Sequence, residues 1–290
     1  MENSLQKNVA FVISRNYIGQ FKVTFNSLFN ANTDIQFLVH LFHNDLSNDD
    51  IDDIKSFVFE RNSKIAFYKI SDELFSGLPK MQNDNSYSAY YKTLLPYYLS
   101  HLDKVLFLDC DIIVRGNVKP LFEKEQDEFL SWVPDYKINK KRQDHIVNIV
   151  GEKSIYYNSG VMLLDFKKSE SIVPQDEMLK YIAESSHLIR WHDQDILNHF
   201  YARKSCTLDE KYNYLTTYKS IKDLFFPKGK KNAVIVHYAN WKPWRSNYIG
   251  KCYRLYKKNY DKLSGEKSVD FLKKRNLIAQ LKLIFSYIFR

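Results

Sequence analysis

The 290-residue chain has few cysteines and few glycines, and each shortage argues against a class of protein. Its three cysteines, Cys110, Cys206 and Cys252, are widely spaced and support neither a disulfide framework nor a thiolate zinc site. Its eight glycines form neither GxGxxG after the first apolar run nor GxxxxGK[ST]. The phosphate-binding loops of nicotinamide, flavin and P-loop nucleotide proteins are therefore missing.

Long apolar runs are also absent. No run reaches the roughly 20 residues of a membrane-spanning helix, and the first residues lack the basic and apolar regions of a secretory signal. Together with the unpaired cysteines, these absences predict a protein of the reducing cytoplasm.

Short apolar runs alternate with helical patterns over the first 110 residues. The runs at 9–13, 35–42, 65–70 and 105–108 have the length of buried strands. Helical spacing of apolar residues starts at position 18, Ser47 opens a capping box, and a tyrosine-rich segment at 88–99 predicts a further helix. This alternation favours one α/β domain over residues 1–248, with its ligand site at the carboxyl ends of the strands.

An acidic pair, Asp109 and Asp111, interrupts the apolar run that includes Val105 and continues to Val114. In a strand, residues two apart point to the same side. Two like charges buried together are unfavourable unless a cation holds them, and aspartate oxygens suit Mg²⁺ or Mn²⁺. The alternative is that the pair only ends the strand and caps the next turn.

A later apolar run, 233–236, ends at His237, with Lys242 close behind. An imidazole joined to two carboxylates favours Mn²⁺ somewhat over Mg²⁺. Lys242 is placed for a phosphate that the metal also contacts. The alternative is an ordinary hydrogen-bonded histidine at the rim of the core.

Two further polar segments carry candidate residues. Asp193, Gln194 and Asp195 precede a helical pattern, and the alternative is that they cap that helix. A polar turn at 158–160 begins with Asn158 and leads into a strand, and its alternative is a turn without further role.

In chain order these segments resemble the family 8 retaining glycosyltransferases, and the likeness extends from Ala10 to Trp244. The residues that carry it are Asn16-Tyr17, Tyr87 to Tyr98 with Pro96, Asp109-Cys110-Asp111, Asn158-Ser159-Gly160, Asp193-Gln194-Asp195, and His237 with Lys242-Pro243-Trp244. The resemblance implies a GT-A fold, which is a Rossmann-like, mostly parallel mixed sheet with flanking helices.

The resemblance also implies an activity. A hexose, galactose or glucose, would move from a uridine diphosphate sugar with net retention at the anomeric carbon. Mn²⁺, with Mg²⁺ as second choice, would be held by Asp109, Asp111 and His237. The donor-binding residues implied are Asn16, Lys92, Asp109, Cys110, Asp111, Asn158, His237 and Lys242, and the catalytic candidates are Asp193, Gln194 and Asp195. Both double displacement and attack on the face that the diphosphate leaves remain open.

The sequence departs from the family pattern at three points, one of which is a shorter segment from His237 to Lys242 with Asn240 in place of a usual glycine. Ser14, Arg15 and Asn16 stand where many relatives carry acidic residues after the first strand. Lys92 stands where an arginine is common, which keeps the charge but loses the planar fork of a guanidinium group.

The positive charge is concentrated at the C-terminus. The formal net charge is +9, and residues 250–290 hold eight lysines and three arginines against three acidic residues. Apolar residues from Leu277 to Phe289 recur at helical spacing. We expect residues 249–290 to form a basic amphipathic helical tail that binds an anionic membrane surface, on the inner face of a bacterial cytoplasmic membrane. The alternative is a helix packed on the catalytic domain.

Other functions explain less of the sequence. A nucleic-acid-binding protein would use the tail alone, so no nucleic-acid partner is expected. A metal-dependent phosphohydrolase of the aspartyl-phosphate type would carry its acidic pair on the first strand, and a non-catalytic sugar-nucleotide-binding protein would not need the full set of motifs. A glycan or glycolipid acceptor, such as lipopolysaccharide or a capsular precursor, fits the tail best.

Overall fold

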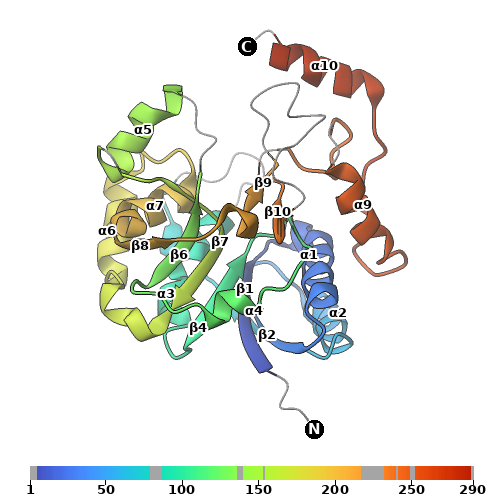
Figure 1. The fold of residues 1–290 in the computed structure, drawn as a ribbon, viewed down its shortest axis with the longest axis horizontal. Coiled ribbons are helices and arrows are strands. Elements are labelled where there is room, and N and C mark those ends of the chain that lie inside the picture. The colour runs from blue at the N-terminus through green and yellow to red at the C-terminus, as the bar shows by residue number, and fades with distance from the viewer. Residues whose placement is uncertain are drawn as a thin grey trace.

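The computed structural model describes residues 5–78, 87–135, 140–152, 154–216, 232–239, 241–248 and 252–288. A seven-stranded sheet forms the centre of the molecule (Figure 1), with the strand order β3-β2-β1-β4-β7-β6-β8. Its strands are β1 (Leu5–Val12), β2 (Ile35–His43), β3 (Lys64–Lys69), β4 (Lys104–Leu108), β6 (Leu130–Pro134), β7 (Tyr157–Asp165) and β8 (Ser205–Thr207). A smaller sheet contains β5 (Ile112–Val114), β10 (Ile235–His237) and β9 (Tyr214–Leu215), in that order.

The strand directions match the mixed sheet that was predicted. Strand β1 pairs in parallel with β2 and β4, and β2 with β3. Strand β7 is antiparallel to both β4 and β6, and β6 is parallel to β8. The direction therefore changes at β4, and the acidic pair follows that strand directly.

Helices flank the larger sheet on both sides. They are α1 (Ile18–Ala31), α2 (Asn48–Phe59), α3 (Leu95–Tyr98), α4 (Lys119–Glu123), α5 (Lys140–Val150), α6 (Gln175–Ser185) and α7 (His192–Tyr201). Two further helices, α9 (Tyr253–Asp261) and α10 (Leu277–Ile288), belong to the C-terminal segment and lie outside these layers. The capping box is confirmed, because Ser47 and Asp50 exchange side-chain and backbone hydrogen bonds at the start of α2.

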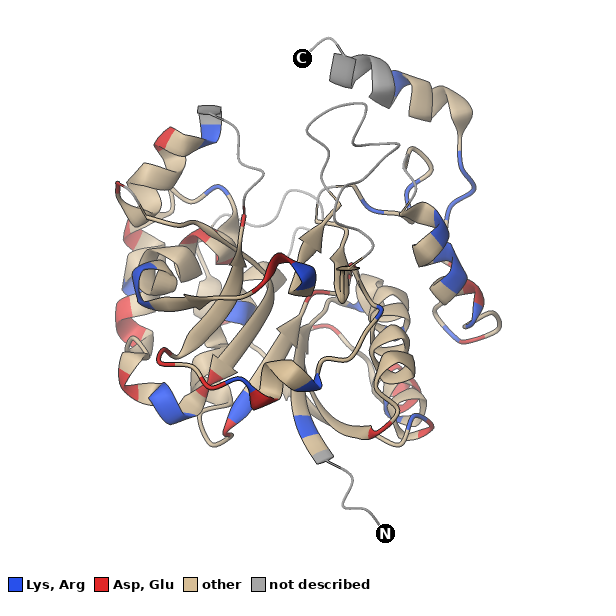
Figure 2. Cartoon of the chain, in the orientation of Figure 1, with Lys and Arg blue, Asp and Glu red and all other residues tan. Residues whose placement is uncertain are grey.

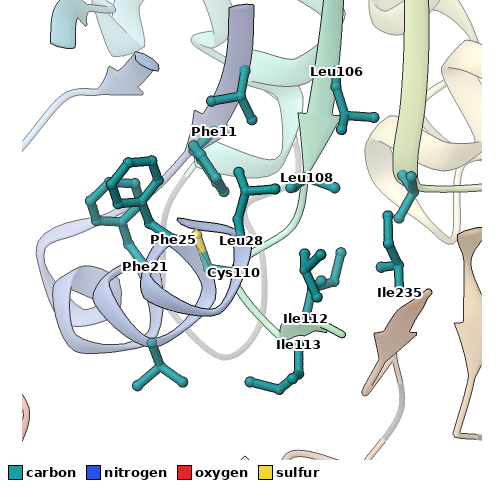
Figure 3. Packing of buried hydrophobic residues seen from close by; sticks show 14 of the residues in the cluster. Phe11, Phe21, Phe25, Leu28, Leu106, Leu108, Cys110, Ile112, Ile113 and Ile235 are labelled. Atoms are coloured by element: carbon teal, nitrogen blue, oxygen red, sulfur yellow. The ribbon is translucent and has the colours of Figure 1, made fainter. Parts of the chain in front are cut away.

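Helix α1 packs into the main hydrophobic core (Figure 3). The ring of Phe21 meets Phe11 of β1 edge to face at 5.1 Å and stacks on Phe25 at 5.9 Å. Every residue of α1 from Ile18 to Leu28 is buried. A helix buried on all sides needs a second covering layer besides the sheet, and the C-terminal segment supplies it.

Two segments differ from the sequence prediction. Residues 88–99 begin as a 3₁₀ helix, Ser88–Leu94, and only Leu95–Tyr98 is α-helical. Pro96 has no amide hydrogen to donate to the carbonyl of Lys92, so a continuous α-helix is interrupted there. The predicted turn at 158–160 is instead part of strand β7, at a register shift opposite Trp132 and Val133.

The segment that follows residue 251 packs against α1. Tyr256 and Val269 are buried in the main core. Lys22 of α1 is fully buried, and its ammonium group contacts Asp53 at 2.9 Å and the carbonyl oxygen of Lys267 at 3.0 Å. A Cβ atom at Gly19 would collide with the carbonyl oxygen of Ser268. The predicted boundary after residue 248 stays a prediction, but residues 252–271 share the core of the domain.

Helix α10 lies at the far end of this segment and carries exposed apolar residues. Leu277 is 70% exposed and Ile278 is 67% exposed. Within the described ranges, no helix combines the length and the apolar character needed to cross a membrane.

Buried His40 makes the stability of the fold depend on pH. Its ring lies 2.9 Å from the Tyr68 hydroxyl and 3.2 Å from Asn8 Oδ1, and burial, with a smaller effect of His101, lowers its pKa from 6.5 to about 4. Below pH 6.5 the unfolded chain therefore binds a proton that the folded protein does not, and stability falls as the pH falls towards 4.

We expect the His40→Gln variant to lose about 2 kcal/mol less of its unfolding free energy than the parent protein between pH 7.5 and 5. Urea titrations at both pH values measure this difference. Equal losses in the two proteins would contradict the burial effect.

Candidate active site

The link between β4 and β5 places Asp109 and Asp111 at the carboxyl edge of the larger sheet. Strand β4 ends at Leu108 and β5 begins at Ile112, so the link contains only Asp109, Cys110 and Asp111. Buried Thr24 of α1 holds the link, since its hydroxyl lies 3.0 Å from the carbonyl oxygen of Cys110 and 2.9 Å from that of Ile112.

Strand β10 brings His237 to the acidic pair. Its antiparallel pairing with β5 sets His237 opposite Ile112. The Nε2 atom of His237 lies 3.2 Å from Asp111 Oδ1 and 3.8 Å from Asp109 Oδ2. The three predicted metal ligands thus meet, with one ligand atom from each lying within 4.8 Å of the others.

This cluster fits a divalent ion such as Mn²⁺ or Mg²⁺. Two carboxylates and one imidazole are a suitable donor set. Gly160 keeps space beside them, because a Cβ atom there would collide with Cε1 of His237 and lie 2.9 Å from Asp109 Oδ2. A side chain at position 160 would displace two ligands at once.

Two lysines balance the acidic pair. Lys92 Nζ lies 2.8 Å from Asp109 Oδ1 and 2.9 Å from Asp193 Oδ2. Lys242 Nζ contacts Asp111 Oδ2 and lies 3.2 Å from the carbonyl oxygen of Tyr238. Each of the two predicted lysines thus pairs with a different aspartate of the acidic pair.

These charges shift the pKa values of the two carboxyl groups in opposite directions. For Asp111, burial is outweighed by Lys242 and His237, and its pKa is lowered. For Asp109, burial raises the pKa, and the neighbouring Asp111 adds to this rise against the opposing effect of Lys92. Asp111 is therefore the more firmly ionised of the pair.

The predicted Asp193-Gln194-Asp195 segment lies at the start of α7. Asp193 Oδ2 accepts a hydrogen bond from the Ser159 hydroxyl at 2.7 Å, besides contacting Lys92. Gln194 Oε1 accepts from Asn158 Nδ2 at 3.0 Å and from the backbone amide of Ser159 at 3.2 Å. Strand β7 and helix α7 are therefore tied together beside the acidic pair.

Asp195 lies apart from this group and is fully buried. Its carboxylate accepts hydrogen bonds from the Tyr156 hydroxyl at 2.5 Å, His145 Nε2 at 2.9 Å, and the backbone amides of Arg190 and Trp191 at 2.7 and 2.9 Å. By accepting these four hydrogen bonds, Asp195 holds the loop that leads into α7. This structural role resembles the helix-capping alternative.

A pocket of about 230 Å³ opens at this edge of the sheet. Its lining residues are Val12, Ile13, Ser14, Tyr17, Ser88, Ala89, Lys92, Asp109, Cys110, Asp111, Asp193 and Lys242. Asn16, Asn158, Gln194, Asp195 and His237 are not among them. Asn16 is exposed in the 3₁₀ helix Arg15–Tyr17, so its predicted donor contact is not part of this pocket.

The structure adds residues that were not among the predicted donor-binding or catalytic residues. Ser14 and Tyr17 line the pocket on either side of Arg15, whose side chain instead contacts Asp50 at 2.8 Å. Asn213 is 1% exposed and contacts both His237 and Asn158. Nothing in the local sequence marks Asn213, since it precedes a strand of only two residues.

Comparison with known proteins shows that this chain is similar to glycosyltransferases. The sequence model described as "Glycosyl transferase family 8" matches residues 8–248. A lipopolysaccharide 1,2-glucosyltransferase of Escherichia coli is 27% identical over 85% of this chain and 76% of its own length. A lipopolysaccharide 1,3-galactosyltransferase of Salmonella typhimurium is 27% identical over 82% of this chain and 73% of its own.

Glycosyltransferase GlyA of Streptococcus pneumoniae is also 27% identical over 84% of this chain, which spans only a third of GlyA. Among solved structures, the galactosyltransferase LgtC in complex with donor and acceptor sugar analogues superimposes with a TM-score of 0.72 at 20% identity, covering 95% of this chain and 99% of LgtC. This likeness confirms the expected GT-A architecture. Because the family model spans most of the sequence, the chain belongs to glycosyltransferase family 8.

Proposed function

We propose that this chain transfers galactose or glucose, with retention, from a uridine diphosphate sugar to a bacterial cell-surface glycan. The observation that carries the proposal is the meeting of Asp109, Asp111 and His237 beside Lys242. A sugar diphosphate must lose a highly charged leaving group, and this cluster gathers ligands for a cation next to a fixed positive charge.

A divalent ion, Mn²⁺ in this proposal, would be held by Asp109, Asp111 and His237. When bound, it would stabilise the negative charge of the departing diphosphate without any proton donor. Mg²⁺ is the alternative ion, since the two carboxylates suit either metal and the imidazole favours Mn²⁺.

The protein's own cations complete the charge balance. The Lys242 side chain is 21% exposed and lines the pocket, so a diphosphate bound there would lie beside this lysine. Lys92 is 10% exposed and already contacts Asp109 and Asp193. We infer that Lys242 binds the leaving group, while Lys92 orients the two carboxylates.

The contacts of α7 favour attack on the face that the diphosphate leaves. A double displacement needs a nucleophile beneath the sugar ring. The amide oxygen of Gln194 accepts two hydrogen bonds, Asp195 is enclosed by four donors, and Asp193 is paired with Lys92. Each of the three side chains is thus already held by protein groups, so we assign Asp193 and Gln194 to positioning the donor sugar.

The acceptor class follows from the relatives. Two of them are lipopolysaccharide hexosyltransferases. We propose a lipopolysaccharide core or capsular precursor as acceptor, met at the cytoplasmic face of the membrane. The basic residues along α9 and the chain that leads to α10 (Figure 2), with the exposed apolar residues of α10, would bind that face.

A panel of sugar nucleotides tests the activity directly. We expect release of uridine diphosphate from one donor, UDP-galactose or UDP-glucose, only when Mn²⁺ or Mg²⁺ is present, because slow donor hydrolysis needs no acceptor. The measurement is nucleotide release with and without the metal. Donor-induced thermal stabilisation without release would instead indicate a sugar-nucleotide-binding protein without turnover.

The Asp111→Asn variant tests the metal site. Removing this charge takes away a ligand and the partner of Lys242, so we expect metal-dependent release to fall by about 100-fold or more. Asp103→Asn is the matched control, because the Asp103 side chain is 83% exposed and does not line the pocket at the acidic pair. Circular dichroism checks that both variants fold, and full activity in Asp111→Asn would overturn the metal assignment.

A tail variant tests membrane binding. Deletion of residues 277–290 removes α10 but keeps the segment that packs on α1. We expect the shortened protein, and the double variant Leu277→Glu with Ile278→Glu, to stay in solution when anionic phospholipid vesicles are sedimented. The parent protein should sediment with anionic vesicles and not with neutral ones. Unchanged sedimentation of both variants would contradict attachment through α10.

A further inference from the structure

Asn213 occupies a junction between the proposed metal site and helix α7. It immediately precedes β9, which pairs in parallel with β10 beside His237. Its Oδ1 atom lies 2.9 Å from Nδ1 of His237, and its Nδ2 atom lies 2.8 Å from Oδ1 of Asn158. A buried amide with both ends engaged holds its neighbours in one orientation.

The side chains of Gln194, Asn158, Asn213 and His237 form a hydrogen-bonded series. Two backbone amides fix the direction of each hydrogen bond in it. A backbone N–H group can only donate. The amide of Gly160 donates to Asn158 Oδ1 at 3.1 Å, and the amide of Ser159 donates to Gln194 Oε1 at 3.2 Å. Asn158 Oδ1 is thereby an acceptor, and Asn158 Nδ2 points towards the oxygen of Gln194.

The donor and acceptor roles of Asn213 and His237 follow from those of Asn158. Because Asn158 Oδ1 accepts, the group of Asn213 that faces it must be the NH₂ donor. The carbonyl oxygen of Asn213 then faces His237, and only an N–H group at Nδ1 can form that bond. The lone pair of a neutral imidazole is left on Nε2, which is the nitrogen that faces Asp109 and Asp111.

We propose that Asn213 is a positioning residue that fixes the Nδ1–H tautomer of His237 and so prepares Nε2 to bind the metal. The inference rests on the metal role proposed for His237. Without this constraint, the neutral ring would place its hydrogen on Nε2 and donate to Asp111 Oδ1 at 3.2 Å, which would block that nitrogen as a ligand. Asn213 opposes that competing bond.

The tautomer can be measured without any metal. We expect ¹⁵N-histidine NMR of the metal-free parent protein, at a pH where the His237 ring is neutral, to show the hydrogen on Nδ1. The His237→Gln variant assigns the signal. A neutral ring with its hydrogen on Nε2 in the parent protein would overturn the proposal, whether or not the protein transfers sugar.

Variants at position 213 separate positioning from folding. We expect Asn213→Leu to move the hydrogen to Nε2 and to weaken Mn²⁺ binding by about 10- to 100-fold, measured by electron paramagnetic resonance of free Mn²⁺. Asn213→Asp keeps an acceptor for Nδ1–H and should keep the parent tautomer. Asn32→Leu is the matched control, because Asn32 is also 1% exposed and bonds only backbone groups remote from the site, those of Leu28, Val118 and Gly116.

Each outcome decides between the two proposals. Parent-like Mn²⁺ affinity and tautomer in Asn213→Leu would overturn the role of Asn213. If that variant does not fold, an Nε2–H tautomer in Asn213→Asp would overturn it equally. A parent protein that has the Nδ1–H tautomer and binds no Mn²⁺ would uphold the role of Asn213 in setting the ring and would contradict the proposed metal.

Discussion

The repulsion between two neighbouring carboxylates, Asp111 buried and Asp109 partly exposed, is the constraint that organises this structure. Asp109 and Asp111 occupy a three-residue link at the end of a buried strand, where neither can rely on water alone for compensation. Each has its own lysine, and these lysines come from segments about 150 residues apart in the sequence. The fold brings both cations to the link, so the site is assembled from distant parts of the chain.

The smaller sheet positions His237 relative to the acidic pair. Strand β5 follows the link directly, and the register of its pairing with β10 places His237 beside Asp111. Further pairing of β10 with β9 brings Asn213 behind the imidazole. Three very short strands therefore determine the relation among two carboxylates, one imidazole and the amide that orients it.

Much of the fold was predictable because its signals are local. The apolar runs of β1, β2, β3 and β4 and the capping box at Ser47 are visible within a few residues, and the acidic pair stands out against its apolar surroundings. The residues 158–160 were misread as a turn, because a strand with polar residues and a register shift has no periodic pattern. Asn213 was missed because its role depends on contacts 24 and 55 residues away in the chain.

The site predictions also succeeded where the sequence signal is local and failed where the surroundings depend on the fold. Residue types at strand ends predicted Asp109, Asp111 and His237, and the structure joins them because β10, which ends at His237, pairs with β5 directly after the acidic pair. The spacing in Asp193-Gln194-Asp195 could not reveal that its two carboxylates have different surroundings. Helical geometry turns residues two apart to different sides, so one lines the pocket and the other lies among buried donors.

The absence of a side chain at Gly19 bears on how members of this family can be recombined. The backbone near Ser268 lies where a Cβ atom of residue 19 would be, and the carbonyl of Lys267 is the partner of buried Lys22. A chimaera that exchanges the C-terminal segment must therefore exchange this face of α1 with it. Thr24 of the same helix contacts the link between β4 and β5, so a poorly matched graft would also disturb the position of Asp109 and Asp111.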